Sequence, residues 1–252
     1  MLNDPLSSAH VVASDFLDAG ECAETVRRVN GLRGSWTKHS HNGFFTLGAA
    51  SYLDGAESPD SYLAAAAETN PLLSAAFSDL YSGLLGFLEH VLDEPVSYDE
   101  RLALPGFHIF QISGNRSAGP PNTKGIESFD STAAKRAHFD LQFLKAVPDW
   151  TLEATLSFTV PLAQPSGGAG LAVWPFRYEE AVRQNLSGQR FAAQNAYEQV
   201  SYELGRMVLH DGFILHAILR GIVHSGDLAH KGQRITLQGH GIRTNGRWTI
   251  YW

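Results

Sequence analysis

The sequence contains few of the residues on which several protein classes depend. Its 252 residues include one cysteine, Cys22, which excludes an internal disulfide and any metal site built from several thiolates. No stretch approaches the roughly 18 consecutive apolar residues of a membrane span, and residues 1–5 lack the features of a secretory signal. We therefore expect a soluble, cytoplasmic protein, in which any bound metal is held by histidines and carboxylates.

Basic residues are also few. The chain has 19 Lys and Arg against 26 Asp and Glu, a net charge of −7, and no Lys/Arg cluster. This excludes electrostatic capture of nucleic acid or of an anionic membrane surface. Repeats, low-complexity tracts and long linkers are missing as well, which argues against arrays and multi-module proteins. The length and the 44% hydrophobic content predict one domain over residues 1–252.

The N-terminal part, residues 1–104, has the pattern of a helical support region. One apolar stripe recurs at spacings of three and four residues, as on one face of a helix. Its members are Leu73, Phe77, Leu80, Leu84, Leu88 and Val91. Asn70-Pro71 precedes the stripe and predicts two helices, or one helix with a break at that point. A weaker stripe predicts another helix over residues 14–30.

The remaining part, residues 105–252, changes to the alternation of β-strands. Residues 151–160 alternate apolar and polar side chains, and residues 171–174 form a short apolar run. Asp211-Gly212 and Asn245-Gly246 each lie between apolar runs and predict two hairpins. Residues 178–204 are polar and rich in Gln and Ala, which predicts an inserted helical stretch. The expected fold is a helical N-terminal third packed on an antiparallel sandwich or small barrel.

Two possible metal ligands, His138 and Asp140, are separated by one residue. At this spacing they lie on the same face of a strand and can reach one ion. The pair is weak evidence alone, because chance produces about half an H-x-D pair in a chain of this composition. His216 lies in a later apolar strand and offers a third ligand. Two imidazoles and one carboxylate on one face of Fe(II) leave three positions open, as in non-haem iron oxygenases.

The residues after the third ligand fit the same site. A 2-oxoacid would chelate iron at two of the open positions, and O2 would take the third. Arg234 can hold a far carboxylate through two parallel hydrogen bonds, and Thr236, on the same strand face, adds a hydroxyl. His224, ten residues before Arg234, competes with His216 as third ligand. We favour His216, because His224 lies in a segment rich in loop-forming residues.

These residues resemble the Fe(II)/2-oxoglutarate-dependent oxygenases. His138, Asp140 and His216 match the family's facial triad, and Arg234 matches the arginine that binds 2-oxoglutarate. The resemblance implies a mostly β chain with a double-stranded β-helix, or jelly-roll, core over residues 105–252. More narrowly, residues 234–241 and the ending Arg-Trp-Thr-Ile-Tyr-Trp look like the group of free-amino-acid halogenases and hydroxylases that act on lysine-like substrates.

The resemblance also implies the reaction. Fe(II), 2-oxoglutarate and O2 would hydroxylate a C–H bond by hydrogen abstraction and hydroxyl rebound, releasing succinate and CO2. The radical halogenases of this group have a small residue two positions after the first histidine, which leaves a position for chloride. Asp140 fills that position here, so the resemblance favours hydroxylation of a free amino acid, L-lysine or a close basic relative.

A cationic substrate needs a carboxylate partner in the pocket. Glu127 and Asp130 lie in a segment rich in Gly, Pro and Ser that precedes the H-x-D pair, and are candidates. Gln238 and His240 share a strand face with Arg234, so either they line the cavity or that face is exposed to solvent. Trp252 is a further candidate for contact with substrate, although such tryptophans are more often core residues.

Two other functions remain open at this stage. The chain could be a peptidyl or other small-molecule 2-oxoglutarate hydroxylase, for which an open groove would favour a peptide. It could also be a non-redox, cupin-like metal-binding protein that uses the same ligands. The N-terminal helices could serve as a lid or as the surface of a homodimer.

Overall fold

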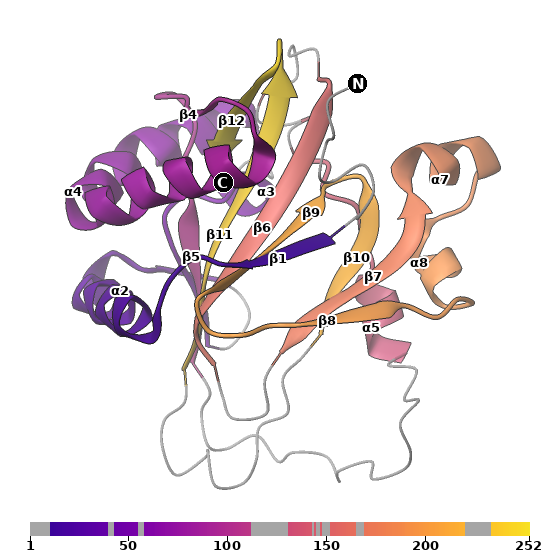
Figure 1. Ribbon diagram of the computed structural model, residues 1–252, viewed down its shortest axis with the longest axis horizontal. Helices are drawn as coiled ribbons and strands as arrows, with labels where there is room; N and C mark the ends of the chain where they lie inside the picture. The colour runs from indigo at the N-terminus through magenta and orange to yellow at the C-terminus, as the bar shows by residue number, and fades with distance from the viewer. Residues whose placement is uncertain are drawn as a thin grey trace, which may run out of the picture.

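Two antiparallel sheets form the centre of the molecule, and helices lie outside them (Figure 1). The computed structural model describes residues 11–39, 43–54, 58–111, 131–142, 144, 147, 152–164, 169–219 and 233–252. Glu127, Asp130 and His224 lie outside these ranges.

The large sheet has nine strands. Its main path runs in the order β1-β9-β6-β11-β5-β3-β2, and β12 pairs with both β11 and β4. The strands are β1 (Val11–Asp15), β2 (Thr37–Lys38), β3 (Phe44–Leu47), β4 (Val96–Tyr98), β5 (Gly106–Gln111), β6 (Ala154–Ala163), β9 (Arg206–Asp211), β11 (Gln233–Thr244) and β12 (Arg247–Tyr251). All pairs are antiparallel except β12 with β4. The N-terminal third thus contributes four strands besides its helices.

The small sheet has the order β10-β7-β8, with β7 (Gly170–Arg177), β8 (Glu198–Ser201) and β10 (Ile214–Leu219). An isolated bridge joins His138 to His216, so the chain around His138 runs beside the free edge of β10. Residues that lie far apart in the sequence therefore meet at this edge.

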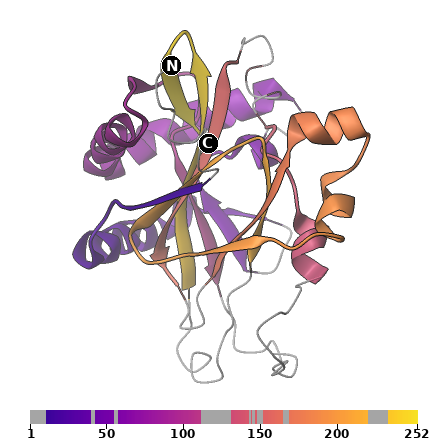
Figure 2. The ribbon, with the colours of Figure 1, turned by 45° about the vertical axis from the view of Figure 1, so that its right-hand side comes forward.

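Helices cover the outer faces of the two sheets (Figures 1 and 2). They are α2 (Ala19–Gly31), α3 (Ser51–Asp54), α4 (Pro59–Leu92), α5 (Ser131–Arg136), α7 (Tyr178–Gln184) and α8 (Gly188–Ala192), with a 3-10 turn at Arg33–Ser35. Apolar side chains of α2 and α4 share one core with the large sheet, and those of α5, α7 and α8 share another with β7 and β10.

The predicted N-terminal helices need two corrections. The first helix begins at Ala19, not residue 14, because a capping box of Asp18 and Glu21 sets its start and the preceding residues pair with β9 as strand β1. The second, α4, continues through Pro71 and has its one irregular residue at Phe77. Buried residues on both sides of Pro71, including Ala66 and Leu73, hold the helix in place against the body of the protein.

Helix α4 is long and apolar enough to cross a membrane by length and composition. Its apolar face, however, is occupied by the fold. Phe77, Leu84 and Leu88 are fully buried in the core that α4 shares with the large sheet. The helix is therefore a core element of the domain.

Two strand predictions and one of the two hairpins are confirmed. The alternating segment predicted at 151–160 becomes β6, which begins at Ala154 and continues to Ala163; the apolar run at 171 lies in β7, and Asn245 and Gly246 form the β11–β12 turn with positive φ angles of 52° and 69°.

The predicted hairpin at Asp211-Gly212 is wrong. A turn does occur at Gly212-Phe213, where the Asp211 carboxylate accepts a hydrogen bond from the Phe213 amide. However, β9 pairs with β1 and β6 in the large sheet and β10 pairs with β7 in the small sheet, so the turn carries the chain from one sheet to the other. The stretch 178–204 contains two short helices and also strand β8.

The C-terminal residue supports one wall of the interior. Trp252 is fully buried, and its ring centroid lies 5.3 Å from that of His108 on β5. Gly106 makes this approach possible, because a Cβ at that position would lie 2.0 Å from two atoms of the Trp252 ring and 2.9 Å from the Leu47 carbonyl oxygen. Only glycine at position 106 therefore leaves room for the Trp252 ring.

We expect Gly106→Ala to lower the free energy of unfolding by about 3 kcal/mol, because the added methyl group overlaps a buried ring and a backbone oxygen. Gly86→Ala on α4 is the control, since nothing lies within 4 Å of a Cβ there. It should stabilise the protein by about 0.5–1 kcal/mol. Urea unfolding measures both; equal stability of Gly106→Ala and wild type would contradict the close packing.

His108 makes the stability of the protein depend on pH. Its buried ring forms a hydrogen bond with the Tyr52 hydroxyl, and burial, assisted by the charge of Arg234, lowers its pKa to about 3. The unfolded chain, with a histidine pKa near 6.5, therefore takes up a proton that the folded protein excludes. The contribution is complete above about pH 6.5 and is lost as the pH falls towards 3.

Between pH 7 and pH 5, His108 should account for about 2 kcal/mol of the lost free energy of unfolding. His108→Gln removes this titration, so the variant should lose about 2 kcal/mol less than wild type over the same interval. Urea unfolding at the two pH values gives the difference. An identical loss in both proteins would show that His108 titrates normally in the folded state.

Candidate metal centre and cofactor cavity

The first two candidate ligands are held against β10 by backbone hydrogen bonds. The His138 amide donates to the His216 carbonyl at 2.9 Å, and the His216 amide donates to the His138 carbonyl at 3.1 Å. Two residues later, the Asp140 amide donates to the Gly212 carbonyl at 2.9 Å. The H-x-D segment therefore runs as an extra strand along the small sheet, and its two side chains share one face with His216.

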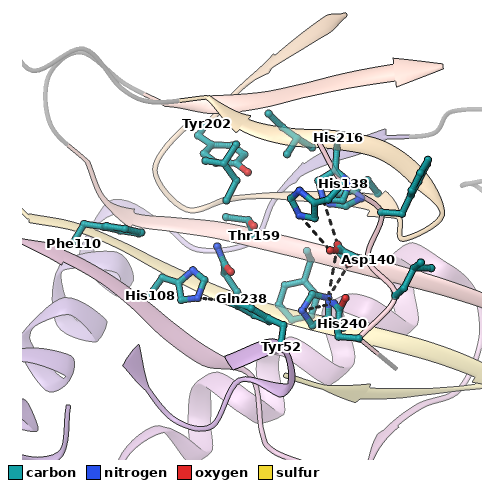
Figure 3. Close-up of a pocket in the computed structure, with 18 of the residues that line it drawn as sticks. Tyr52, His108, Phe110, His138, Asp140, Thr159, Tyr202, His216, Gln238 and His240 are labelled. Carbon is teal, nitrogen blue, oxygen red and sulfur yellow. Dashed lines mark hydrogen bonds and ion pairs between the residues drawn. The ribbon is translucent and has the colours of Figure 1, made fainter. Parts of the chain in front are cut away.

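The three side chains converge on one point. His138 Nε2 lies 3.6 Å from Asp140 Oδ1, and His216 Nε2 lies 3.4 Å from Asp140 Oδ2. Their ligand atoms all lie within 4.8 Å of one another, a grouping that could hold a metal ion. Figure 3 shows the two imidazoles directed at the Asp140 carboxylate.

The backbone fixes which nitrogen of each imidazole is available. His138 Nδ1 lies 2.7 Å from the Arg136 carbonyl oxygen, and His216 Nδ1 lies 2.9 Å from the Ile214 carbonyl oxygen. A carbonyl only accepts hydrogen bonds, so each Nδ1 carries the proton and each Nε2 offers a lone pair towards Asp140. This is the arrangement by which metal-binding histidines are oriented in proteins.

Burial sets the charges at this point. It lowers the pKa of His216 well below the ordinary histidine value and that of His240 to about 4, although Asp140 opposes both shifts. Burial would also raise the pKa of Asp140, but the surrounding imidazoles, above all that of His216, outweigh it and hold the pKa below its ordinary value. At neutral pH Asp140 is therefore a carboxylate and the buried His216 and His240 are uncharged, and a metal needs its ligands in these states.

A cavity of about 510 Å³ extends from the three ligands between the two sheets. Phe44, Tyr52, His108 and Phe110 line one side of it, and His138, Asp140 and His216 line another. Figure 3 shows Gln238 and Thr159 between these two groups. The volume suits a small molecule.

A cation lies beside the cavity, away from the ligands. The Arg234 guanidinium carbon lies 5.6 Å from the Phe110 ring and 5.8 Å from the Tyr202 ring, and both of these residues line the cavity. Arg234 Nε is buried and has no hydrogen-bond partner among the residues that the structure describes. Thr236, 1% exposed, follows on the same strand face. A partly buried arginine whose Nε has no partner among the described residues fits an anionic ligand.

Only some of the residues predicted to contact substrate line the cavity. Gln238 and His240 line the cavity, so this face of β11 points inward. Trp252 lies behind the cavity wall, in contact with His108, and is not among the lining residues. Glu127 and Asp130 lie outside the described residues and stay predictions.

Several residues that form the site were not singled out from the sequence. Tyr52, His108, Ser157, Tyr202 and His210 all line the cavity. His210 was not considered as a site residue, yet its ring centroid lies 4.3 Å from that of His216. Ser157 belongs to the polar face of β6. The alternation of that strand was visible, and it could have indicated a polar interior as well as solvent.

Comparison with known proteins gives structural likeness alone. No protein-family model and no curated protein matches the chain. Among solved structures, an N-substituted L-amino acid dioxygenase from Burkholderia ambifaria AMMD, in complex with α-ketoglutarate, is similar with a TM-score of 0.54 and 15% identity over 98% of this chain and 87% of the other. SnoK, a non-heme α-ketoglutarate-dependent carbocyclase from nogalamycin biosynthesis, gives 0.51 and 11% over 98% and 94%.

These likenesses concern the fold. Both similar proteins match nearly the whole chain, helical N-terminal region included. Together with the two facing antiparallel sheets, they confirm the predicted fold: this chain is a double-stranded β-helix with packed helices.

Proposed function

We propose that this protein is an Fe(II)/2-oxoglutarate-dependent dioxygenase that hydroxylates a small molecule. One observation carries the proposal. His138, Asp140 and His216 converge at a cavity between the sheets, and Arg234, a partly buried cation whose Nε has no partner among the described residues, lies beside the same cavity. The proposal treats residues 1–252 as one soluble, cytoplasmic domain, in which residues 1–104 support a core formed by residues 105–252.

The donor set fits ferrous iron. Two neutral imidazole nitrogens and one carboxylate suit a divalent first-row metal, and three protein ligands leave coordination positions for other groups. Iron would supply the activation of O2 for attack on a C–H bond, and the protein would supply orientation and a largely dry cavity. The carbonyl hydrogen bonds to both Nδ1 atoms hold the rings in the orientation that this role requires.

The far end of the cavity fits the co-substrate. 2-Oxoglutarate has a 2-oxoacid end, which binds metals, and a second carboxylate at the other end. Arg234 would bind that second carboxylate, and the Thr236 hydroxyl would add a hydrogen bond. The aromatic rings of Phe110 and Tyr202 beside Arg234 keep water from competing for the guanidinium.

The substrate that we propose is a free amino acid, with L-lysine or a close basic relative first. The sequence resemblance to amino-acid hydroxylases supports it, and the similar Burkholderia protein, an N-substituted L-amino acid dioxygenase, is consistent with the wider amino-acid class. Among the described lining residues, Asp140 is the one carboxylate. A lysine ammonium group would therefore need a carboxylate from outside the described residues, and Glu127 and Asp130 are the predicted candidates.

The carboxylate at position 140 favours hydroxylation over halogenation. Asp140 provides a carboxylate oxygen where a halogenase would need room for a halide ion. The cavity volume of about 510 Å³ is also in the range that small-molecule sites occupy. A non-redox metal-binding protein with the same ligands would have no use for the partly buried cation at Arg234.

The protein loaded anaerobically with Fe(II) should convert 2-oxoglutarate to succinate when O2 and a suitable amino acid are supplied. The twenty amino acids are tested in turn, and each is then analysed by mass spectrometry for a gain of one oxygen atom. His216→Ala should abolish succinate formation. Succinate without an amino-acid product would move the substrate to peptides or other metabolites, and no turnover at confirmed iron occupancy would contradict the dioxygenase assignment.

Arg234→Gln should raise the KM for 2-oxoglutarate by about 10- to 100-fold, because a charge-assisted hydrogen bond to a carboxylate contributes about 1.5–3 kcal/mol. Fe(II) affinity should remain within a few-fold of wild type, since Arg234 touches none of the three ligands. Thr236→Ala is the matched comparison and should have the smaller effect. An unchanged KM in Arg234→Gln would remove Arg234 from the co-substrate site.

A further inference from the structure

Three polar residues form one row across the inner face of the large sheet. Ser157 on β6 lies directly opposite His210 on β9 and opposite His240 on β11. Directly opposed residues of neighbouring strands point to the same face of a sheet. The row therefore faces the cavity, and all three side chains line it.

Ser157 connects this row to the small-sheet side of the site. Its Oγ donates a hydrogen bond of 2.5 Å to Asp140 Oδ2 and lies 2.8 Å from His240 Nδ1. Gln142 Nε2 lies 2.7 Å from His240 Nδ1 and 2.8 Å from His240 Nε2. Asp140 comes from the segment beside β10, so these contacts join the two sheets.

The chemistry of the groups fixes which atom donates in each of these hydrogen bonds. The Asp140 carboxylate accepts hydrogen bonds only, so the Ser157 hydroxyl must give it its single proton. Ser157 Oγ then accepts from His240 Nδ1, so the lone pair of His240 lies on Nε2 and accepts from the Gln142 amide; the 2.7 Å approach of Gln142 Nε2 to Nδ1 is then a contact between two donors and not a hydrogen bond. Each polar group thus has a defined role, and Ser157 cannot rotate away without leaving a buried carboxylate oxygen without its donor.

We propose that Ser157, oriented by His240 and Gln142, is a positioning residue for the metal ligand Asp140. The inference rests on the proposed function. A carboxylate free to turn can bind an ion through both oxygens and occupy one more coordination position. The hydrogen bond from Ser157 engages Oδ2, so Oδ1 would be the oxygen available to an ion. One-oxygen binding by Asp140 would leave room at the ion for 2-oxoglutarate and O2.

Burial makes water a poor substitute for Ser157. Ser157 is 4% exposed and His240 is 9% exposed. Loss of the hydroxyl would leave Asp140 Oδ2 and His240 Nδ1 without their shared partner, and buried polar groups without partners are costly. His240, which the sequence predicted to contact substrate, would then act mainly by orienting the Ser157 hydroxyl through their hydrogen bond.

The test compares metal binding in two variants of Ser157. Co(II) is titrated into the metal-free protein under anaerobic conditions, and its visible absorption reports both affinity and coordination. Ser157→Ala should weaken Co(II) binding about 10- to 100-fold and change the spectrum, as expected when a partner of a ligand is lost. Ser157→Thr keeps the hydroxyl on a residue suited to strands and should bind within a few-fold of wild type.

Ser201→Ala is the matched control, because it removes a hydroxyl from an exposed position on strand β8. It should leave Co(II) affinity and the spectrum unchanged. Wild-type affinity and an unchanged spectrum in folded Ser157→Ala would overturn the proposal. If Ser157→Ala does not fold, Ser157→Thr decides: a loss of affinity or an altered spectrum in that variant would also overturn it.

The same titration separates this inference from the proposed function. Wild-type protein that binds Co(II), with binding lost in His216→Ala, supports the metal centre on which the role of Ser157 depends. If 2-oxoglutarate then leaves the Co(II) spectrum unchanged, the co-substrate assignment fails while the comparison of Ser157 variants still stands. If wild-type protein binds no Co(II), the proposed function and the role of Ser157 both fail.

Discussion

The buried carboxylate of Asp140 is the group on which the arrangement of the site depends. Its side chain is 13% exposed, and a buried charge is unfavourable unless polar partners surround it. The large sheet supplies a donor, the Ser157 hydroxyl, and the small-sheet side places the Nε2 lone pairs of His138 and His216 around the carboxylate, an arrangement that a bound cation would stabilise. The backbone bridge between His138 and His216 is what holds the H-x-D segment within reach of both.

The fold keeps its apolar cores away from this polar centre. The largest core lies between the large sheet and helices α2 and α4, and a second lies between the small sheet and helices α5, α7 and α8. Most of the hydrophobic stabilisation therefore comes from the outer faces of the sheets. The cavity between the sheets also has apolar walls, but the hydrogen-bonding groups of the site gather there, and this explains why polar residues of β6 such as Ser157 are buried.

Charge is distributed unevenly along the cavity. Asp140 lies at one part of it and the Arg234 guanidinium beside another, while the groups between them, such as Gln238 and Thr159, are uncharged. A ligand with a metal-binding end and a far carboxylate matches this pattern. Arg234 is costly to bury, and burial lowers its pKa; an anionic ligand beside it would offset that cost.

The sequence by itself determined the class of fold and the chemistry of the site. Strand alternation predicted β6, and the Asn245-Gly246 pair predicted the β11–β12 hairpin. The spacing of His138 and Asp140 placed both side chains on one strand face. All three features depend on local backbone geometry. The N-terminal strands β1 to β4 were missed, since short strands of two to five residues carry little periodicity. Only the tertiary structure decided that His216 pairs with His138, that Ser157 and His240 face Asp140, and that Trp252 supports the wall behind His108. These contacts join segments far apart in the chain, and no local pattern records which strand will lie opposite another.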